Sequence, residues 1–340
     1  MERKVIVFAQ EHYNPLNIIR ALGEEGIRPV FISVKRNYEI ASKSKYISTL
    51  HKVSDIEAGY DILMKKYALY FGEDRPYILF SDDRCMSFFD RHYDEWKDRF
   101  IGFNAGKQGR INEFMDKYKI QQLAKKHGFN VLDSYVINRK DPIPDNLWYP
   151  VITKDISPVS GNWKGDVFIC NDEKELKNSI DRIASPQIMI QHFVDKQNEL
   201  ALEGYSINHG KDIHIVTQMT WKYLIQGYYS PYHDVRMFND NDIERGLMEM
   251  FREIGYEGIF EVEFLIDKDG TFYFMETNFR ASAWNLTGMV AGMPLPNLWI
   301  KGMANRKINK KDRKDFQPFT SMSEIIDYGK RVEGGDVQPW

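Results

Sequence analysis

One segment, residues 258–280, constrains the fold of this chain more than any other. It consists of two alternating apolar runs that flank the dipeptide Asp269-Gly270. Asp-Gly between such runs is a strong signal for a β-hairpin with a two-residue loop. With that loop, the two strands bring Glu263 directly opposite Glu276. The sequence therefore predicts a hairpin that carries two opposed carboxylates.

Opposed carboxylates need a partner, because like charges that face each other destabilise a bare pair of strands. A hard divalent cation turns the repulsion into binding, since Mg²⁺ prefers carboxylate and carbonyl oxygens together with substrate phosphates. Asn278 lies two residues beyond Glu276 and projects from the same face. A four-residue loop would place Glu261 opposite Glu276 instead, and either register leaves two carboxylates and one amide beside Arg280. The alternative is an amphipathic hairpin whose glutamates face water.

Length, composition and charge exclude several classes of protein. A chain of 340 residues is long enough for two or three compact lobes. The net charge of -3 argues against nucleic acid as the main partner, because nucleic-acid binding favours a basic face. Only two cysteines occur, Cys85 and Cys170, which suits a reducing compartment. No apolar run approaches the ~18 residues of a membrane span, so we expect a cytoplasmic protein without a membrane partner. A homodimer is compatible with the sequence.

The first 105 residues, roughly, alternate strand and helix signals. Strands are predicted at Val5–Ala9, Val30–Val34 and Tyr77–Phe80, and helices after Asn14-Pro15 and at Ile56–Tyr70. This alternation predicts a parallel sheet with right-handed crossovers. Such sheets bind ligands at the carboxyl ends of their strands, so Asp82 and Asp83 are candidate substrate contacts or, alternatively, ordinary polar loop residues. No G-x-G-x-x-G follows the first strand, which argues against a dinucleotide site.

Helices and strands are also predicted in the rest of the chain. Helices are expected at residues 113–128, 242–254 and 281–291, and strands at 188–193, 199–207 and 213–220. The tail from Lys301 to about Lys314 is polar and rich in Lys and Arg, without strong periodicity. We expect this tail to be exposed and less ordered than the segments before it.

The end of the hairpin resembles the metal-binding element of the ATP-grasp superfamily. Glu276-Thr-Asn278-Phe-Arg280 fits that family's Glu-x-Asn-x-Arg pattern, and Glu263 stands where the first metal ligand belongs. The resemblance implies that Glu263, Glu276 and Asn278 hold Mg²⁺ or Mn²⁺. It also implies that Arg280 is catalytic and steadies the transferred phosphoryl group.

Two upstream lysines extend the resemblance to the triphosphate of ATP. Met115-Asp116-Lys117 opens a helix, and Tyr149-Pro-Val-Ile-Thr-Lys154 is similar to a family strand that ends in a lysine. By resemblance both lysines contact phosphate, and Lys154 is also catalytic. The alternative is that Lys154 is an ordinary exposed lysine at the end of a strand. The loop that follows has only two glycines but stands where the family has a glycine-rich lid. Gly161 and Lys164 in it are therefore expected to contact the nucleotide.

The segment Ile188–Val194 looks like the hinge strand that lines the adenine in this family. The family's usual glutamate is Gln191 here, and its carbonyl oxygen can still accept a hydrogen bond from an amino group. By resemblance, backbone groups of His192 and Val194 complete the contacts with the base. Glu199 matches the position that holds the ribose hydroxyls.

The resemblance covers the chain to about residue 300 and implies its fold class, α/β and α+β. An N-terminal parallel α/β (pre-ATP-grasp) lobe is followed by a two-subdomain ATP-grasp fold. We expect the lobe at residues 1–110 and the ATP-grasp domain at 111–305, with a small lid subdomain at about 128–195. Residues 306–340 form the C-terminal tail.

Within the superfamily, Asn17–Ile27 and Trp284–Gly292 resemble stand-alone carboxylate–amine ligases of the D-aspartate ligase type. This resemblance implies an ADP-forming ligase that joins a small-molecule carboxylate to an amine through an acyl phosphate, with ATP as co-substrate. Asp82 and Arg236 are its candidate substrate contacts. One alternative is a carboxylase or carbamoyl-phosphate-forming enzyme, in which bicarbonate is the carboxylate. Another is a nucleotide-binding module without catalysis.

Overall fold

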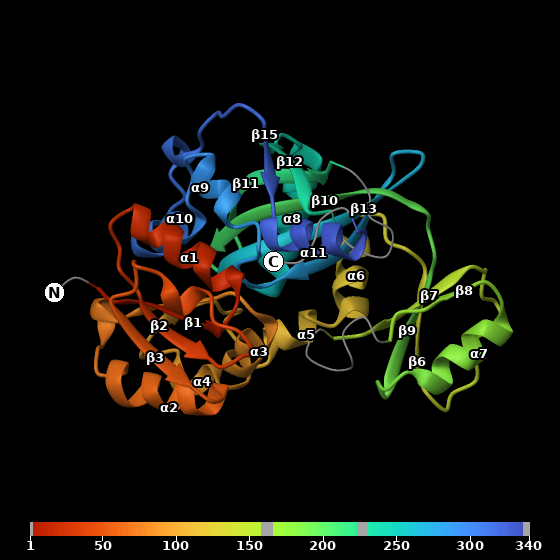
Figure 1. The fold of residues 1–340 in the computed structure, drawn as a ribbon, viewed down its shortest axis with the longest axis horizontal. Coiled ribbons are helices and arrows are strands. Elements are labelled where there is room, and N and C mark those ends of the chain that lie inside the picture. The colour runs from red at the N-terminus through yellow and green to blue at the C-terminus, as the bar shows by residue number, and fades with distance from the viewer. Residues whose placement is uncertain (1–2, 158–165, 223–229, 336–340) are drawn as a thin grey trace.

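Three β-sheets organise the protein (Figure 1). The computed structural model describes residues 3–157, 166–222 and 230–335. A five-stranded parallel sheet comes first, a four-stranded antiparallel sheet follows, and a six-stranded antiparallel sheet completes the chain. This arrangement confirms the predicted fold class.

The parallel sheet has the strand order β3-β2-β1-β4-β5. Its strands are β1 (Val5–Gln10), β2 (Val30–Val34), β3 (Thr49–Val53), β4 (Tyr77–Phe80) and β5 (Ile101–Gly102). The helices of this lobe are α1 (Tyr13–Glu24), α2 (Ile56–Tyr67), α3 (Asp83–Arg91) and α4 (Tyr93–Trp96). Every residue of β2 and β4 is buried, because helices cover both faces of such a sheet. That coverage is why these strands read as short apolar runs without alternation.

The four-stranded sheet and one helix form a small unit at the right of Figure 1. The strand order is β6-β9-β7-β8, with β6 (Ser134–Asn138), β7 (Val151–Asp155), β8 (Ile169–Cys170) and β9 (Gln187–His192). The helix α7 (Glu173–Arg182) begins after Asp172, whose carboxylate accepts a hydrogen bond from Glu175 N. Leu176 and Ile180 on α7 belong to an apolar core that is separate from the core of the other two sheets.

The six-stranded sheet carries the hairpin and has the order β14-β13-β10-β11-β12-β15. Its strands are β10 (Lys196–Ile207), β11 (Asp212–Trp221), β12 (Tyr232–Met237), β13 (Gly258–Asp267), β14 (Phe272–Asn278) and β15 (Phe319–Met322). One face packs on α8 (Asn241–Ile254), where the ring centroids of Phe251 and Phe260 lie 4.2 Å apart. On the other face, α10 (Leu295–Asn305) contacts β10 and β13 and also α1. Thus α10 joins the six-stranded sheet, which we call the central sheet, to the N-terminal lobe.

The hairpin pairs Glu263 with Glu276, as predicted, but its loop differs from the prediction. Three residues, 268–270, form the loop, because Asp267 N donates to Thr271 O at 3.1 Å. A shift of register between Glu263 and the next residue then restores the predicted pairing. The four-residue loop is excluded, since Glu261 pairs with Asn278 rather than with Glu276.

Two predicted helices are wrong in extent. The helix expected at residues 113–128 is two helices, α5 (Arg110–Phe114) and α6 (Lys117–Lys126). The Asp116 carboxylate starts the second one by accepting a hydrogen bond from Lys119 N. The helix expected at 281–291 shrinks to α9 (Leu286–Val290). Ser282 Oγ accepts a hydrogen bond from Trp284 N and so stabilises a turn before it.

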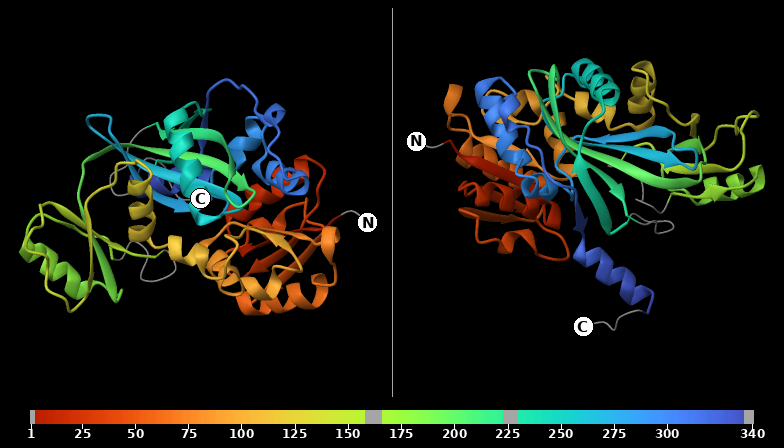
Figure 2. Two further views of the ribbon diagram at one scale, coloured as in Figure 1. Left: turned by 180° about the vertical axis from the view of Figure 1, so that it is seen from behind. Right: turned by 90° about the horizontal axis from the view of Figure 1, so that it is seen from above.

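The C-terminal tail is more ordered than predicted. Lys301 lies inside α10, and β15 extends the central sheet by pairing with β12. The last helix, α11 (Glu324–Glu333), projects from the body of the protein (Figure 2). Between α10 and β15 the chain is irregular except for a 3₁₀ turn at Lys310–Asp312, which agrees with the expectation for that stretch.

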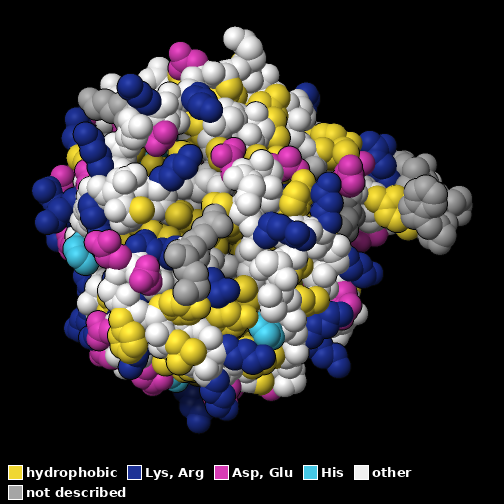
Figure 3. Space-filling view, turned by 90° about the vertical axis from the view of Figure 1, so that its left-hand side faces the viewer, with side chains coloured by type: hydrophobic (Ala, Val, Ile, Leu, Met, Phe, Trp, Pro, Cys, Tyr) yellow, Lys and Arg dark blue, Asp and Glu magenta, His cyan; other side chains and the backbone are white. Residues whose placement is uncertain are grey.

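The surface and the helices add two negative findings. Lys and Arg side chains are interspersed with Asp and Glu over the face in Figure 3, so this face is not a basic one. No helix within the described ranges is both long enough and apolar enough to cross a membrane.

A prediction concerns Gly210, in the turn between β10 and β11. Its φ is +75°, and a Cβ added there would lie 1.9 Å from the Phe251 carbonyl oxygen on α8. Gly26 also has a positive φ, +83°, but nothing lies within 4 Å of a Cβ added there. We expect Gly26→Ala to cost about 1–2 kcal/mol, the penalty of the left-handed conformation. Gly210→Ala should cost about 1–3 kcal/mol more because backbone atoms must also move.

The two glycine variants can be compared by their apparent melting temperatures in the absence of ligand. The lower value is expected for Gly210→Ala. Equal melting temperatures for the two variants would contradict the close contact between Gly210 and the Phe251 carbonyl oxygen on α8.

Candidate functional site

Acidic side chains line one face of the central sheet across three neighbouring strands. Glu203 on β10 pairs with Glu261 on β13, which pairs in turn with Asn278 on β14. Two residues along β13, Glu263 pairs with Glu276. Alternate residues of a strand share a face, so all five side chains project to the same side. Glu203 and Glu261 are buried, and burial raises the pKa of both because it makes their charged forms costly.

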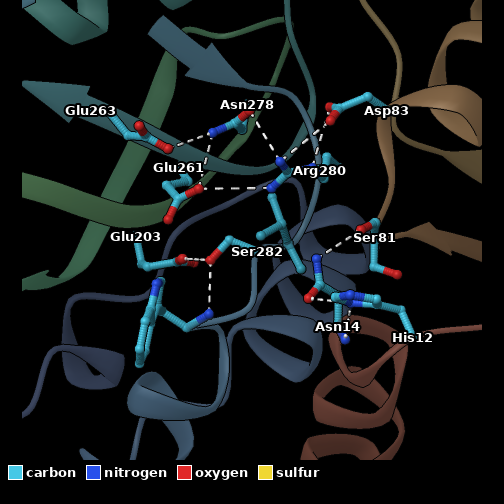
Figure 4. Close-up of polar contacts among 12 residues, drawn as sticks. His12, Asn14, Ser81, Asp83, Glu203, Glu261, Glu263, Asn278, Arg280 and Ser282 are labelled. Carbon is cyan, nitrogen blue, oxygen red and sulfur yellow. Dashed lines mark hydrogen bonds and ion pairs between the residues drawn. The ribbon is translucent and has the colours of Figure 1, made fainter. Parts of the chain in front are cut away.

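The Asn278 amide lies between two of these carboxylates (Figure 4). Its Nδ2 donates to Glu261 Oε2 at 3.0 Å and to Glu263 Oε1 at 2.9 Å. Its Oδ1 accepts from Arg280 Nη2 at 3.1 Å. Burial raises the pKa of Glu263 well above its usual value, and the charges of Glu276 and Glu261 raise it further. The cluster therefore favours any added positive charge.

Arg280 connects this cluster to the N-terminal lobe. Its Nε lies 3.2 Å from Asp83 Oδ1, and its Nη1 lies 3.7 Å from Glu261 Oε2. Although burial by itself lowers the pKa of Arg280, the carboxylates of Asp83 and Glu261 outweigh it and raise the pKa above the ordinary value. The next residue, Ala281, donates its N–H to the Phe80 carbonyl oxygen at the end of β4. The end of β14 is thus attached to the carboxyl edge of the parallel sheet.

Lys117 and Lys154 approach the carboxylates from the other side. Lys117, the first residue of α6, places its Nζ 3.3 Å from Glu276 Oε2. The charge of Glu276 raises the pKa of Lys117, and the charge of Lys117 lowers the pKa of Glu276. Lys154 Nζ donates to Gln191 Oε1 at 2.8 Å. Burial lowers the pKa of Lys154 to about 8, with a contribution from the nearby charge of Lys117.

Gln191 is the centre of a buried amide network. Besides accepting from Lys154, it donates through Nε2 to Gln121 Oε1 and to Ser134 Oγ, both at 2.9 Å. Gln121 in turn donates to the carbonyl oxygen of Met275, beside the register shift of the hairpin. Both polar atoms of the Gln191 side chain therefore have partners within the protein. In this state the side chain positions Lys154 instead of facing an open pocket.

The expected ribose and adenine positions lie at the junction of β9 and β10. Glu199 Oε1 lies 2.5 Å from Lys196 Nζ, and burial raises the pKa of Glu199. The same ammonium lies 4.1 Å from the centre of the Trp221 ring. His192 and Val194 are half-buried, and the N–H of His192 donates to the carbonyl oxygen of Asp133.

Not every predicted residue joins this cluster. Asp82 uses both carboxylate oxygens within the fold, since they accept from Gln10 N and Cys85 N. Its neighbour Asp83 is the residue that reaches the site. Arg236 is exposed and alternates with the buried residues of β12, so it lies on the face opposite the carboxylates. Gly161 and Lys164 lie outside the described residues.

Sequence reasoning missed several members of the site. These are Gln121 and Ser134, which contact Gln191, Lys196, which pairs with Glu199 on the same strand, and Glu203, which pairs with Glu261 on the neighbouring strand. Only Glu203 carried a usable signal, because it follows Glu199 at a spacing of four and so shares its face of a strand. Gln121 and Ser134 depend on tertiary contacts, whereas Lys196 pairs locally with Glu199.

The donor set fits a divalent cation. Glu263 and Glu276 offer carboxylate oxygens from facing strands, and the Asn278 amide can present its oxygen after a rotation. In the structure an N–H of Asn278 takes the position of positive charge beside Glu263. Among the described residues, no three His, Cys, Asp or Glu side chains could hold an ion together. The ion would therefore need further oxygens, which Mg²⁺ commonly takes from phosphates and water.

The fold is shared with several solved enzymes. An L-amino acid ligase from Bacillus licheniformis superposes with a TM-score of 0.66 at 15% identity, over 89% of this chain and 75% of that one. An N5-carboxyaminoimidazole synthetase from Staphylococcus aureus gives 0.72 at 14% identity, over 99% and 87%. A biotin carboxylase from Campylobacter jejuni gives 0.70 at 18% identity, over 94% and 75%. At such identities the likeness shows the fold alone.

Comparison of the sequence with known families assigns the chain more directly than the likeness in fold. No curated protein sequence matches it. Residues 116–311, more than half of the chain, match the family described as carbamoyl-phosphate synthase L chain, ATP binding domain. The chain therefore belongs to this family, within the ATP-grasp superfamily.

Proposed function

We propose that this protein is an ADP-forming ligase that joins a carboxylate to an amine through an acyl phosphate. The observation that carries the proposal is one constellation, in which the opposed Glu263 and Glu276 meet cationic side chains from three separate elements. Lys117 comes from α6, Lys154 from β7 and Arg280 from the residues after β14. The triphosphate of ATP with a divalent cation matches this distribution of charge, because the cation can lie at the carboxylates and the phosphates at the lysines and Arg280.

The lysines have the role of binding phosphate oxygens. Lys117 already pairs with a carboxylate, so a phosphate oxygen can replace that partner without leaving the ammonium unpaired. Lys154 is held by Gln191 and gains a counter-charge when phosphate binds. A divalent cation bound at Glu263 and Glu276 would neutralise charge on the phosphate oxygens. The catalytic contribution of these residues is positioning and electrostatic stabilisation.

The proposed reaction has two displacements. A carboxylate oxygen of the substrate attacks the γ-phosphorus, the bond between that phosphorus and the β–γ bridging oxygen breaks, and ADP leaves. The amine nitrogen then attacks the acyl carbon, the bond from that carbon to the phosphate oxygen breaks, and phosphate leaves as the nitrogen loses a proton. Arg280, fixed by Asp83, is placed beside the carboxylate cluster to stabilise negative charge in both steps.

A second candidate uses bicarbonate as the carboxylate. It is supported by the likeness to a biotin carboxylase and to an N5-carboxyaminoimidazole synthetase, which is as close as the likeness to the amino acid ligase. The same constellation of cations and carboxylates would serve both reactions. Dependence of ATP hydrolysis on bicarbonate, with no amino acid or other carboxylate present, separates them.

The products of the reaction test the proposal first. ATP should be split to ADP and phosphate once the carboxylate is found, and hydroxylamine should intercept the activated acid as a hydroxamate. Nucleotide products can be separated by ion-exchange chromatography. AMP as the stoichiometric product would overturn the mechanism.

The metal ligands can be tested by substitution. Glu276→Ala should lower Mg²⁺-dependent ATP consumption about 10²-fold or more, the scale for losing an electrostatic contact at the reacting centre. It should leave the circular dichroism spectrum unchanged, because Glu276 is only half-buried. Glu253→Ala, a surface carboxylate on α8 that pairs with Lys126, is the control and should retain activity. Near-normal turnover by folded Glu276→Ala would remove Glu276 from the site.

Binding of Mg-ATP should take up a proton near pH 8. The pKa of Lys154 is lowered to about 8 in the free protein, so about half of the molecules carry a neutral amine at that pH. A phosphate beside the amine raises the pKa, and the neutral fraction must then bind a proton. At pH 6.5 Lys154 is already protonated in both states, so uptake should be much smaller.

Calorimetric titration in buffers with different ionisation enthalpies measures this uptake. Lys154→Met should abolish the difference between the two pH values. The same uptake at pH 8 in wild type and Lys154→Met would show that another group binds the proton.

A further inference from the structure

An imidazole and a guanidinium lie at the carboxyl edge of the parallel sheet, on the side of the N-terminal lobe that faces Arg280. Gln10 on β1 pairs with Val34 on β2, and His12 and Arg36 each stand two residues beyond this pair. Both residues therefore follow neighbouring strands at the edge where open α/β sheets bind ligands. Neither belongs to the nucleotide and metal positions described above.

The segment that follows β2 is folded against the end of β1. Glu11, the residue before His12, accepts hydrogen bonds from two backbone N–H groups of this segment, at 2.7 and 3.0 Å. The ring centroid of Tyr38, in the same segment, lies 6.0 Å from that of His12. These contacts hold the segment that carries Arg36 beside the His12 ring.

Two hydrogen bonds to the end of β4 bring the start of α1 beside Arg280 (Figure 4). Asn14 Nδ2 donates to the carbonyl oxygen of Ser81 at 3.3 Å, and Ala281 N donates to the carbonyl oxygen of Phe80 at 3.1 Å. Because the two carbonyl groups belong to consecutive residues, α1 begins next to the segment that follows β14. The imidazole and the catalytic guanidinium are thus on two sides of one junction.

Both side chains have polar groups available for a ligand. His12 Nδ1 lies 3.0 Å from Asn14 Oδ1, whereas His12 Nε2 has no hydrogen-bond partner within the described part of the chain. Arg36 is exposed and forms no ion pair with any described residue. Two carboxylates of this region have other partners, since Glu11 accepts from a buried serine hydroxyl and Glu39 pairs with a lysine on β3.

The electrostatics of this position favour an anion. Burial lowers the pKa of His12, and the charges of Arg36 and Arg280 lower it further, against the raising effects of the Asn14 hydrogen bond and the charge of Glu11. The imidazole is therefore neutral at pH 7. An anion at this position would pair with Arg36 and would favour the protonated imidazole, which donates from Nε2. Guanidinium groups bind carboxylate and phosphate oxygens through two parallel hydrogen bonds.

We propose that His12 and Arg36 bind a second anionic group of the substrate whose carboxylate is activated at Arg280. This assignment rests on the proposed ligase function and names its carboxylate substrate as an acid with two anionic groups. The second group is a carboxylate or a phosphate, because both present the oxygens that a guanidinium and an imidazolium bind. The N-terminal lobe supplies the cations for one group, and the segment after β14 supplies the cation for the other.

The proposal predicts how the protein selects its substrate. An acid with only one anionic group makes no ion pair with Arg36 and leaves the His12 imidazole neutral. It therefore forgoes at least one charge-assisted hydrogen bond, which contributes a factor of about ten to one hundred in affinity. Bicarbonate, with a single charge, is likewise too small to reach both Arg280 and the cations of the N-terminal lobe.

The test uses the whole chain with Mg-ATP and with hydroxylamine as the amine, so that the natural acceptor need not be known. ADP and hydroxamate formation are measured with pairs of acids that differ in the second anionic group. Succinate with succinamate, aspartate with asparagine and glutamate with glutamine test a carboxylate, and 3-phosphoglycerate with glycerate tests a phosphate. We expect at least one doubly anionic acid to be active and its partner to be about ten- to hundredfold less active.

The variant Arg36→Gln removes the charge of an exposed side chain, so the fold should be kept, as judged by circular dichroism. It should raise the KM for the doubly anionic acid about ten- to hundredfold while the Kd for Mg-ATP stays unchanged. Arg252→Gln is the matched control, because Arg252 is also exposed and pairs with Glu249 on α8, away from the site. It should leave both constants unchanged.

A binding measurement that needs no turnover follows the His12 ring. Its proton NMR signal, identified by its absence in His12→Gln, is titrated with pH in the presence and absence of succinate or inorganic phosphate. The pKa of His12 should rise with at least one of these anions in the wild-type protein, and the rise should be smaller in Arg36→Gln.

The outcomes separate this inference from the proposed function. Equal activity of the two members of each pair, or an unchanged KM in Arg36→Gln, would overturn the inference and leave the ligase intact. ATP turnover driven by bicarbonate alone would overturn the proposed function and the assignment to its substrate. In that case a raised pKa of His12 would still establish an anion site at this edge, and an unchanged pKa would remove it.

Discussion

The structure depends on the burial of like charges on one face of a sheet. Four glutamates of β10, β13 and β14 project side by side, and an unpaired arrangement of this kind would destabilise the sheet. The protein compensates with groups from elsewhere: an amide, Asn278, between two of the carboxylates, the ammonium of Lys117 on Glu276, and the guanidinium of Arg280. Folding of the distant elements is thereby linked to assembly of the site.

Arg280 makes that link geometrically specific. Its guanidinium contacts Asp83 in the N-terminal lobe and Glu261 and Asn278 in the central sheet, so it can satisfy its donors only when the two lie in register. The backbone bond from Ala281 N to the carbonyl oxygen of Phe80 holds the same junction a few ångströms away. A ligand bound at this junction would therefore contact the carboxyl edge of the parallel sheet and the acidic face together, which is where open α/β sheets bind ligands.

The sequence predicted the carboxylates and lysines of the candidate site but not the side chains that hold them in position. The pairing of Glu263 with Glu276 followed from the hairpin, although Asp267 builds a longer loop by accepting from Thr271 N, a local contact that the Asp-Gly signal does not include. The lysine positions followed from motifs. Asp83 on Arg280 and Gln121 on Gln191 could not be predicted, because these contacts join residues 197 and 70 positions apart. Such separations are fixed by tertiary packing, which local patterns do not report.

The side chains that the proposal assigns to nucleotide and metal binding have one another as partners in the structure. An N–H of Asn278 donates to Glu263, Lys117 pairs with Glu276, and Lys154 donates to Gln191. Binding can then proceed by exchange of partners, so little new order is needed and few groups are desolvated unpaired.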